Sequence, residues 1–335
     1  MVENIDTKLD HNYVMPSKFY SNELRRSVEA IDVDSYIRTS LNVEQRESLL
    51  ALQHWVIENS LDLRLFYTFY IHPALPLLAY LRYNDFDIDT SISQILGNVK
   101  RRELDDIGGY HLRSPESILN CSAPQLSAFR QIYPQWHCSF NRSGQPVVYK
   151  QLARFVVADL LSLVNTGALP TSRITARQRL INMHLWEHEI CAKLCYQQTV
   201  SLQRIVDQSV FVYDLNGMSL SQIRSEVFSY LHDTLFSAQR LYPSAIGAVY
   251  MINVPAGFSA MWQLFSLSWL DKQLQARVQI FGPAKQWLPV LETTIGLENM
   301  PENYGGSLQE LTESTPQFAE YLYKEPPACT SVYDS

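Results

Sequence analysis

Several features that mark common protein classes are missing from this 335-residue chain. Positive charge is not in excess: the net charge is −7 at pH 7, whereas a general nucleic-acid binder needs a basic surface to neutralise phosphates. No run of about 20 mostly apolar residues is present, so no transmembrane helix is predicted. The nearest candidate, residues 63–81, is interrupted by Arg64, His72, Pro73 and Pro76. The charge argues against a general nucleic-acid binder but leaves a local basic patch open, and any contact with a membrane is expected from the side.

Cysteine is scarce and forms no disulfide framework. The five cysteines are an odd number without regular spacing, at positions 121, 138, 191, 195 and 329. The N-terminus is acidic and polar and lacks the apolar stretch of a signal peptide, so we expect a reducing cytoplasm. A phosphate-cradling glycine loop and a Ser-His-Asp nucleophile motif are also missing, and no enzyme is predicted.

What is present suits a large buried core. Apolar residues make up 46% of the chain and charged residues 18%, which argues against global disorder. Residues 1–40 are polar and predict a loosely docked extension, and 41–112 have a helical period without strand signals. Residues 113–312 predict a second lobe, and 313–335 a surface tail.

Short β-branched and aromatic runs begin after about residue 130. Four of them predict strands, at 146–152, 209–215, 248–254 and 277–281. Helical segments lie between several of them, at 174–203, 219–240 and 258–275. Strands that alternate with helices predict an α/β fold, in which helices cover a mixed sheet with parallel pairs at its centre.

Six segments, in order, resemble the signatures of one family. They are LLAYLRYNDFD (77–87), YPQWHCSFNRSGQPVVYKQL (133–152), LWEHE (185–189), VYDLNGMSLSQI (212–223), YPSAIGAVYMINVPAGFSAMWQLFSLSWL (242–270) and GLENMPENYGGSL (296–308). The chain resembles the CRAL-TRIO lipid-binding family over roughly residues 75–310. It is most similar to the branch that transfers phosphatidylinositol and phosphatidylcholine.

The resemblance implies an all-α N-terminal lobe and an α/β lobe whose sheet floors an apolar cavity. One lipid, a phospholipid or another hydrophobic small molecule, lies in that cavity, and no other cofactor is implied. A mobile helix closes over the lipid and opens during transient contact with a membrane. The implied role is to exchange or present lipid at membranes without covalent chemistry, as a cytoplasmic protein that associates with membranes peripherally.

The segment from Phe258 to Leu270 is apolar nearly all the way round. A helix that packs only on its own core needs one apolar stripe, whereas a lid that faces a lipid and then a bilayer needs two. We therefore expect this segment to be the gate. The residues expected to contact lipid or membrane are Phe258, Met261, Trp262, Leu264, Phe265, Trp269 and Leu270.

In the strand at 209–215, Ser209, Phe211 and Tyr213 share one face. In the family pattern this face lines the cavity, and Ser209 matches a serine that contacts the headgroup. The further residues expected at the lipid site are His137, Val148, Tyr250, Ile252 and Arg277.

Several positions depart from the family pattern. Phe211 replaces a threonine, and His137 and Val148 stand where the branch has tyrosines used for phosphatidylcholine. Asn84-Asp85 and Ser244-Ala245 replace charged pairs used for phosphatidylinositol. Arg277 keeps a cation that can grip phosphate. The cargo is therefore expected to differ from phosphatidylinositol, or to be held differently.

Three alternatives remain open. His184 and His188 form a His-x-x-Glu-His pattern, which two zinc-binding histidines of a metal-dependent enzyme would also show. A haem-binding variant places histidine and tyrosine around the aspartate of the strand exit, but Tyr213 and Leu215 occupy those positions. Finally, domains of this fold can act as regulatory scaffolds that move no lipid, and such a scaffold would bind a protein partner through 1–40 or the tail.

Overall fold

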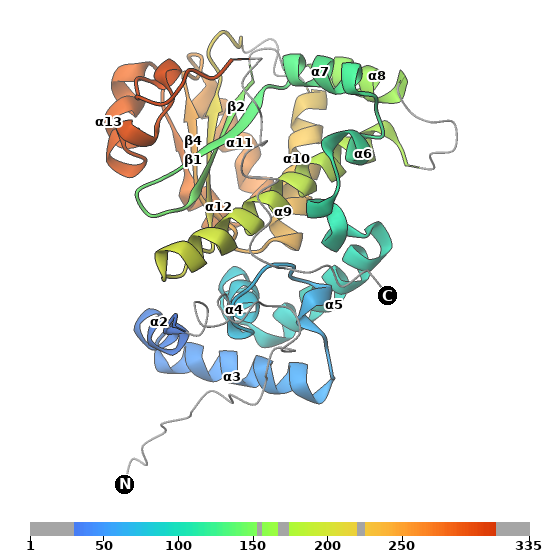
Figure 1. The fold of residues 1–335 in the computed structure, drawn as a ribbon, viewed down its shortest axis with the longest axis vertical. Coiled ribbons are helices and arrows are strands. Elements are labelled where there is room, and N and C mark those ends of the chain that lie inside the picture. Colours follow the sequence, from blue (N-terminus) through green and yellow to red (C-terminus); the bar gives the residue numbers. More distant parts are fainter. Residues whose placement is uncertain (1–29, 153–155, 167–173, 220–224, 313–335) are drawn as a thin grey trace.

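The computed structural model describes residues 30–152, 156–166, 174–219 and 225–312, without the side chains of 138, 225–231 and 264–269, and shows two stacked lobes (Figure 1). The smaller lobe is helical. Its elements are α2 (Val33–Ser40), α3 (Val43–Glu58), η1 (Leu63–Leu65), α4 (Ala74–Tyr83), α5 (Ile88–Asp105) and η2 (Ile107–Leu112). No helix in these ranges combines the length and apolar character that a membrane crossing requires.

Local sequence explains where the helices of the smaller lobe begin. Asn42 caps α3, as its position suggests, and forms a capping box with Gln45. The cap of α5 is Asp87, whose side chain accepts from the amide of Thr90 at 2.7 Å. Asp89 lies in the first turn of this helix, where a negative charge is favourable.

The last residues of the expected extension, 1–40, belong to the helical lobe. Ile31, Val33, Ile37 and Leu41 are buried in the core of the helical lobe. Val33 and Ile37, four positions apart, share one face of α2, and Ile31 and Leu41 flank the helix, so this short helix packs as part of the lobe.

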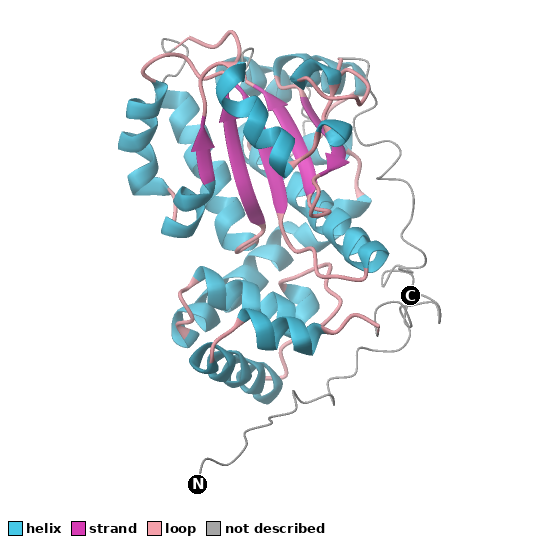
Figure 2. Cartoon of the chain, turned by 90° about the vertical axis from the view of Figure 1, so that its left-hand side faces the viewer, coloured by secondary structure: helices cyan, strands magenta, loops and turns pink. Residues whose placement is uncertain are grey.

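The larger lobe is built on a five-stranded sheet in the order β1-β2-β3-β4-β5 (Figure 2). The strands are β1 (Gln135–Phe140), β2 (Pro146–Gln151), β3 (Ser209–Asp214), β4 (Ile246–Ile252) and β5 (Val278–Ile280). The β1-β2 pair is antiparallel, and the three other pairs are parallel. The mixed sheet with parallel central pairs is therefore confirmed, whereas β1 was not among the four predicted strands.

Helices cover both faces of this sheet (Figure 1). The helices of the larger lobe are α6 (Pro115–Leu119), α7 (Ala123–Ile132), α8 (Val157–Thr166), α9 (Ala176–Leu202), α10 (Ser225–Leu241), α11 (Phe258–Trp269), α12 (Lys272–Arg277) and α13 (Ala284–Thr294), followed by η4 (Leu297–Asn299) and η5 (Glu302–Tyr304). Trp287 and Leu291 of α13 pack on one face of the sheet, and α9 and α11 contribute to the core of the other.

The segment 258–275, expected to be helical throughout, is two helices. Asp271 breaks it because its side chain caps α12, accepting from the amide of Leu274 at 2.8 Å. The apolar segment α11 is thus a separate short helix, joined to α12 through Leu270 and Asp271.

Polar contacts join the two lobes. Arg102 of α5 forms an ion pair with Glu189 of α9, with 2.5 Å between Nη2 and Oε1, and both side chains are buried. The amide of Gln94 donates to the carbonyl oxygen of Arg240 at 2.9 Å. A buried, paired charge at the junction fixes how the lobes meet, because either partner alone would be a buried unpaired charge.

Candidate functional site

The sheet face beneath α9 and α11 carries the first part of the candidate site. Val148 and Phe211 are neighbours in the β2-β3 ladder, and both are buried. Phe258 and Trp262 of α11 belong to the same apolar cluster, with their rings stacked at 6.1 Å between centroids. Leu270 is buried in this cluster too, and Met261 and Tyr213 pack against it. The structure thus brings α11 together with the strand residues predicted for the lipid site.

Two sequence-predicted residues lie on the wrong face of the sheet. Tyr250 and Ile252 belong to the cluster under α13, together with Val212. Tyr250 pairs with Val212 in the ladder, so it shares a face with Val212 and not with Phe211. This corrects the expectation that they line a cavity under α11. Three predicted gate side chains, Leu264, Phe265 and Trp269, lie outside the described residues.

A buried ion pair lies on the same sheet face as Phe211. Lys150 Nζ of β2 lies 2.5 Å from Glu187 Oε2 of α9, and the two side chains are 0% and 1% exposed. Lys150 Nζ also lies 5.3 to 5.9 Å from the ring centroids of Tyr133, Phe211 and Tyr213. Burial opposes the charge of Lys150, but Glu187 and the hydroxyls of both tyrosines outweigh it and hold the pKa well above the ordinary lysine value. The cation is therefore fixed in an aromatic setting.

Three histidines surround this pair and are held neutral. Burial lowers the pKa of His137 to about 3, and it also lowers the pKa values of His184 and His188. His184 Nδ1 lies 3.2 Å from Glu187 Oε2, and the His184 and His188 rings meet edge to face at 4.9 Å. In the described part of the chain, no three histidine, cysteine or acidic side chains are arranged to hold a metal ion. The structure therefore offers no support for zinc at His184 and His188.

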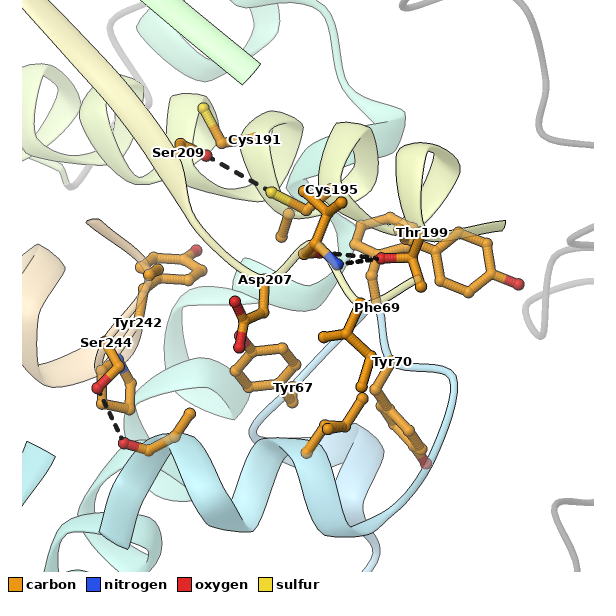
Figure 3. A pocket seen from close by; sticks show the side chains of 18 of the residues that line it. Tyr67, Phe69, Tyr70, Cys191, Cys195, Thr199, Asp207, Ser209, Tyr242 and Ser244 are labelled. Carbon is orange, nitrogen blue, oxygen red and sulfur yellow. Dashed lines mark hydrogen bonds between the residues drawn. The ribbon is translucent and has the colours of Figure 1, made fainter. Parts of the chain in front are cut away.

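A pocket between the lobes forms the second part of the site (Figure 3). Its walls come from the segment before α4, from α4 itself, from the C-terminal half of α9, and from the chain before β3 and β4. It holds about 770 Å³ of empty space, counting the mouth that opens to solvent. The aromatic lining residues are Tyr67, Phe69, Tyr70, Tyr196 and Tyr242. Ser209, predicted for the headgroup site, lines this pocket, with its Oγ 3.6 Å from Cys195 Sγ.

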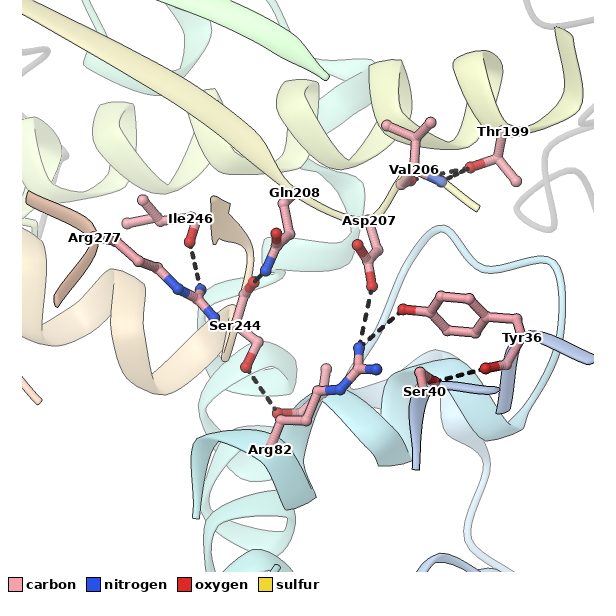
Figure 4. Close-up of polar contacts among 11 residues, drawn as sticks. Tyr36, Ser40, Arg82, Thr199, Val206, Asp207, Gln208, Ser244, Ile246 and Arg277 are labelled. Atoms are coloured by element: carbon pink, nitrogen blue, oxygen red, sulfur yellow. Dashed lines mark hydrogen bonds and ion pairs between the residues drawn. The ribbon is translucent and has the colours of Figure 1, made fainter. Parts of the chain in front are cut away.

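One acid and one arginine line the pocket together (Figure 4). Arg82 Nη1 of α4 lies 3.7 Å from Asp207 Oδ2 and donates to the hydroxyl of Tyr36 at 3.0 Å. The Asp207 side chain remains 41% exposed. Desolvation raises the pKa of this carboxyl, and the opposing effects of Arg82, Arg277 and the Tyr36 hydroxyl do not cancel it.

Arg277, the remaining predicted site residue, borders a smaller adjoining pocket. It ends α12, is half-buried, and donates from Nη1 to the carbonyl oxygen of Ile246 at 2.5 Å. Ser244 lines both pockets and has a left-handed backbone, with φ at 59°. Arg277 and Arg82 thus stand on either side of Ser244 (Figure 4).

Sequence reasoning missed Lys150, Glu187, Asp207 and Arg82. Only Lys150 could have been found from the sequence. It lies two residues after Val148 in the strand PVVYKQL and therefore shares its inward face, where a lysine is unexpected. Asp207 and Arg82 come from different lobes and 125 positions apart, and no local pattern joins them.

The fold and the site define a class of protein. Its members have two lobes, an apolar sheet face under a separate helix, and a pocket between the lobes. The family model of the CRAL/TRIO domain matches residues 131–306, which is 176 of the 335 residues. The chain belongs to the CRAL/TRIO family, as the six segments indicated.

The curated relatives include Sec14 cytosolic factors and a phospholipid transfer protein. The chain is 29% identical over 179 residues to the SEC14 cytosolic factor of Eremothecium gossypii, which covers 52% of this chain and 53% of that protein. It is 27% identical over 256 residues to the Sec14 cytosolic factor of Schizosaccharomyces pombe, covering 73% and 80%. It is also similar, at 22% identity, to the phosphatidylinositol/phosphatidylcholine transfer protein SFH7 of Arabidopsis thaliana, covering 52% of this chain and 29% of that protein.

Among solved structures, the chain is similar to that of Sfh5. The TM-score is 0.57 at 12% identity, and the match covers 89% of this chain and 90% of the other. At this identity the likeness concerns the fold, and it extends over both lobes.

Proposed function

We propose that this protein binds one lipid in its α/β lobe and exchanges or presents it at membranes, with a phospholipid as the first candidate. The observation that carries the proposal is the family match over 131–306, which contains the strands, α9 and α11. A relative named as a phosphatidylinositol/phosphatidylcholine transfer protein supports it. The names of the cytosolic relatives support a cytoplasmic protein that meets membranes peripherally.

The physical task is desolvation. A diacyl lipid has about 30 methylenes, and at about 0.8 kcal/mol each its tails cost on the order of 20 kcal/mol in water. Lipid therefore moves between membranes only if the protein shields it throughout. The sheet face with Val148 and Phe211 supplies apolar surface, and α11 supplies the cover.

The helix α11 is suited to open. Its described inward contacts are apolar, made by Phe258 and Trp262, and no charged residue occurs between Phe258 and Leu270. Gly257 precedes the helix with φ at 86°, a left-handed conformation that glycine adopts without strain. An apolar helix held by non-directional contacts next to a glycine can leave its site without breaking buried ion pairs. We propose that the segment from Phe258 to Leu270 moves out, touches the bilayer and returns over the new lipid.

A matched pair of variants tests this role of α11. Ala260 on α11 and Ala284 on α13 are both exposed and lie in the first turn of their helices. Ala260→Asp adds a charge to the surface proposed to meet the bilayer, whereas Ala284→Asp adds the same charge to the helix on the opposite face. Placing aspartate in a membrane costs up to about 2.5–3.5 kcal/mol, so Ala260→Asp should slow transfer by about tenfold or more.

The assay follows fluorescent phosphatidylcholine or phosphatidylinositol from donor to acceptor vesicles. We expect unchanged melting temperatures for both variants and slow transfer only for Ala260→Asp. Equal transfer by both would remove α11 from membrane contact. A wild-type protein that binds and moves no lipid would overturn the proposed function and favour the scaffold alternative.

A further inference from the structure

The outer surface of α10 carries an exposed aromatic side chain between two polar ones. Phe236 is 46% exposed, although phenylalanine is more often buried. His232, one turn before it, stacks on its ring with 5.7 Å between the centroids and 11° between the planes. Arg240, one turn after it, places its guanidinium carbon 5.4 Å from the ring centroid. The three side chains form one continuous row at a spacing of four residues, which we call the α10 stripe.

The α10 stripe ends where α11, the helix proposed to open, is joined to α12. The side chain of Gln239, the neighbour of Arg240, accepts from the backbone amide of Asp271 at 3.1 Å. Asp271 directly follows the segment proposed to move. The carbonyl oxygen of Arg240 accepts from the side-chain amides of Gln94 and Asn98 in the helical lobe. The C-terminal end of the stripe is therefore held in place beside the end of α11.

Two exposed cations occur at this end of α11 without acidic partners. Arg240 and Lys272 are both exposed, and neither forms an ion pair in the part of the chain that the structure describes. The acid next to Lys272 in the sequence, Asp271, uses its carboxylate to cap the first turn of α12. The acid within the stripe's own helix, Asp233, is paired with Arg177 at 2.7 Å. Both cations thus remain available to an anion from outside.

A helix that opens onto a bilayer needs an attraction that α11 itself does not supply. No charged residue occurs between Asn253 and Leu270, and the whole chain has a net charge of −7. An anionic bilayer repels such a chain unless a local group of cations faces it. An exposed aromatic ring next to cations suits this surface, because the ring enters the headgroup region while the cations contact lipid phosphates. The α10 stripe offers this combination directly beside α11.

We propose that the α10 stripe and Lys272 form a docking surface for anionic membranes, which holds the C-terminal end of α11 at the bilayer while this helix opens. Phe236 enters the headgroup region, and Arg240 and Lys272 contact the phosphates of anionic lipids. This inference rests on the proposed lipid exchange and adds the surface through which the protein meets donor and acceptor membranes. The surface sets the affinity for the bilayer and does not select the lipid carried inside.

Binding of the full chain to vesicles tests this surface. A flotation assay compares vesicles of phosphatidylcholine alone with vesicles in which about one third of the lipid is phosphatidylserine. We expect wild type to bind the anionic vesicles about tenfold or more tightly, because two cations then face negative lipid. Raising the salt concentration should reduce this preference, since salt screens exposed charges.

Three variants and two matched controls locate the contact. Arg240→Gln and Lys272→Gln should each weaken binding to anionic vesicles by about fivefold, as loss of one cation near a membrane surface gives. Phe236→Ala should weaken binding to both kinds of vesicle by about fivefold, because less apolar surface leaves water. The control Lys285→Gln removes an exposed cation of α13, and Ile57→Ala shortens a side chain of α3 that is 45% exposed. Both controls should bind as wild type does.

The outcomes separate the docking surface from the proposed function. Three variants that bind anionic vesicles as wild type does, or controls that lose binding to the same extent, would overturn the surface. Wild type that binds neither kind of vesicle would also overturn it and favour a protein partner for the stripe. Lipid uptake, measured by mass spectrometry of the re-isolated protein, tests the proposed function separately, because a protein that docks through the stripe but carries no lipid would contradict lipid exchange alone. Melting temperatures verify that each variant is folded.

Discussion

Replacing Lys150 by methionine tests the buried ion pair on the sheet face below α9. Lys150 Nζ lies 2.5 Å from Glu187 Oε2, and neither side chain is more than 1% exposed. Methionine fills much of the same space, so the main effect is a carboxylate left buried without its cation. Breaking a buried pair in this way costs about 3–5 kcal/mol, so we expect the free energy of unfolding at pH 7 to fall by that amount.

The pH dependence of this loss has a definite sign. Burial raises the pKa of Glu187, but Lys150 and His184 outweigh it and hold the pKa below its ordinary value of 4.5. In wild type the pair therefore stabilises the fold above about pH 4.5, and this contribution is lost as the pH falls further. Without Lys150, burial dominates and raises the pKa of Glu187. Protonation then removes the buried charge, so the gap between Lys150→Met and wild type should shrink between pH 7 and pH 5.

Urea denaturation at pH 7 and pH 5 measures both effects. The control Lys150→Met/Glu187→Gln removes both charges but keeps an amide next to His184, and should lie within about 1–2 kcal/mol of wild type. A loss below about 1 kcal/mol for Lys150→Met at pH 7, or equal losses for the single and double variants, would refute the reasoning.

The packing leads to three further predictions. Gly306→Ala should lower the free energy of unfolding by about 1–3 kcal/mol or more in a denaturation experiment, because an added Cβ would overlap the carbonyl of Met300; full stability would contradict this close approach of the two segments. Trp262→Ala should increase hydrogen exchange in α11 far more than in the β-strands, since the buried side chain anchors the helix proposed to open; a uniform increase would mean that α11 is an ordinary part of the core. His137 should show no titration between pH 5 and 8 by NMR, because burial lowers its pKa to about 3; a titration near pH 6.5 would show that it is solvated.

The order of strands and helices could be predicted because each β-branched run and each helical period is a local signal. The runs at 146–152 and 209–215 became β2 and β3 with little change in their bounds. The break at Asp271 was a weaker signal, since a capping aspartate looks like any polar residue inside an apolar helix. The inward face was harder to assign in β4 than in β3. Tyr250 and Ile252 were placed on the wrong face because the pairing register of β4 with β3 is a tertiary feature that the sequence of β4 does not contain.

The pocket between the lobes could not be predicted, because it is a product of tertiary packing. Arg82 lies in α4, Asp207 precedes β3, and Tyr67 comes from the segment after η1. Nothing in their spacing along the chain places them together. Ser209 was found through the family pattern, which already contains the three-dimensional information that a single sequence lacks.

The most direct test of lipid carriage is native mass spectrometry of the full chain purified from cells without detergent. We predict a species heavier than the 38.6 kDa polypeptide by the mass of one phospholipid, which organic extraction removes. A protein recovered only at the mass of the bare polypeptide, which also takes up no lipid from vesicles, would contradict lipid carriage.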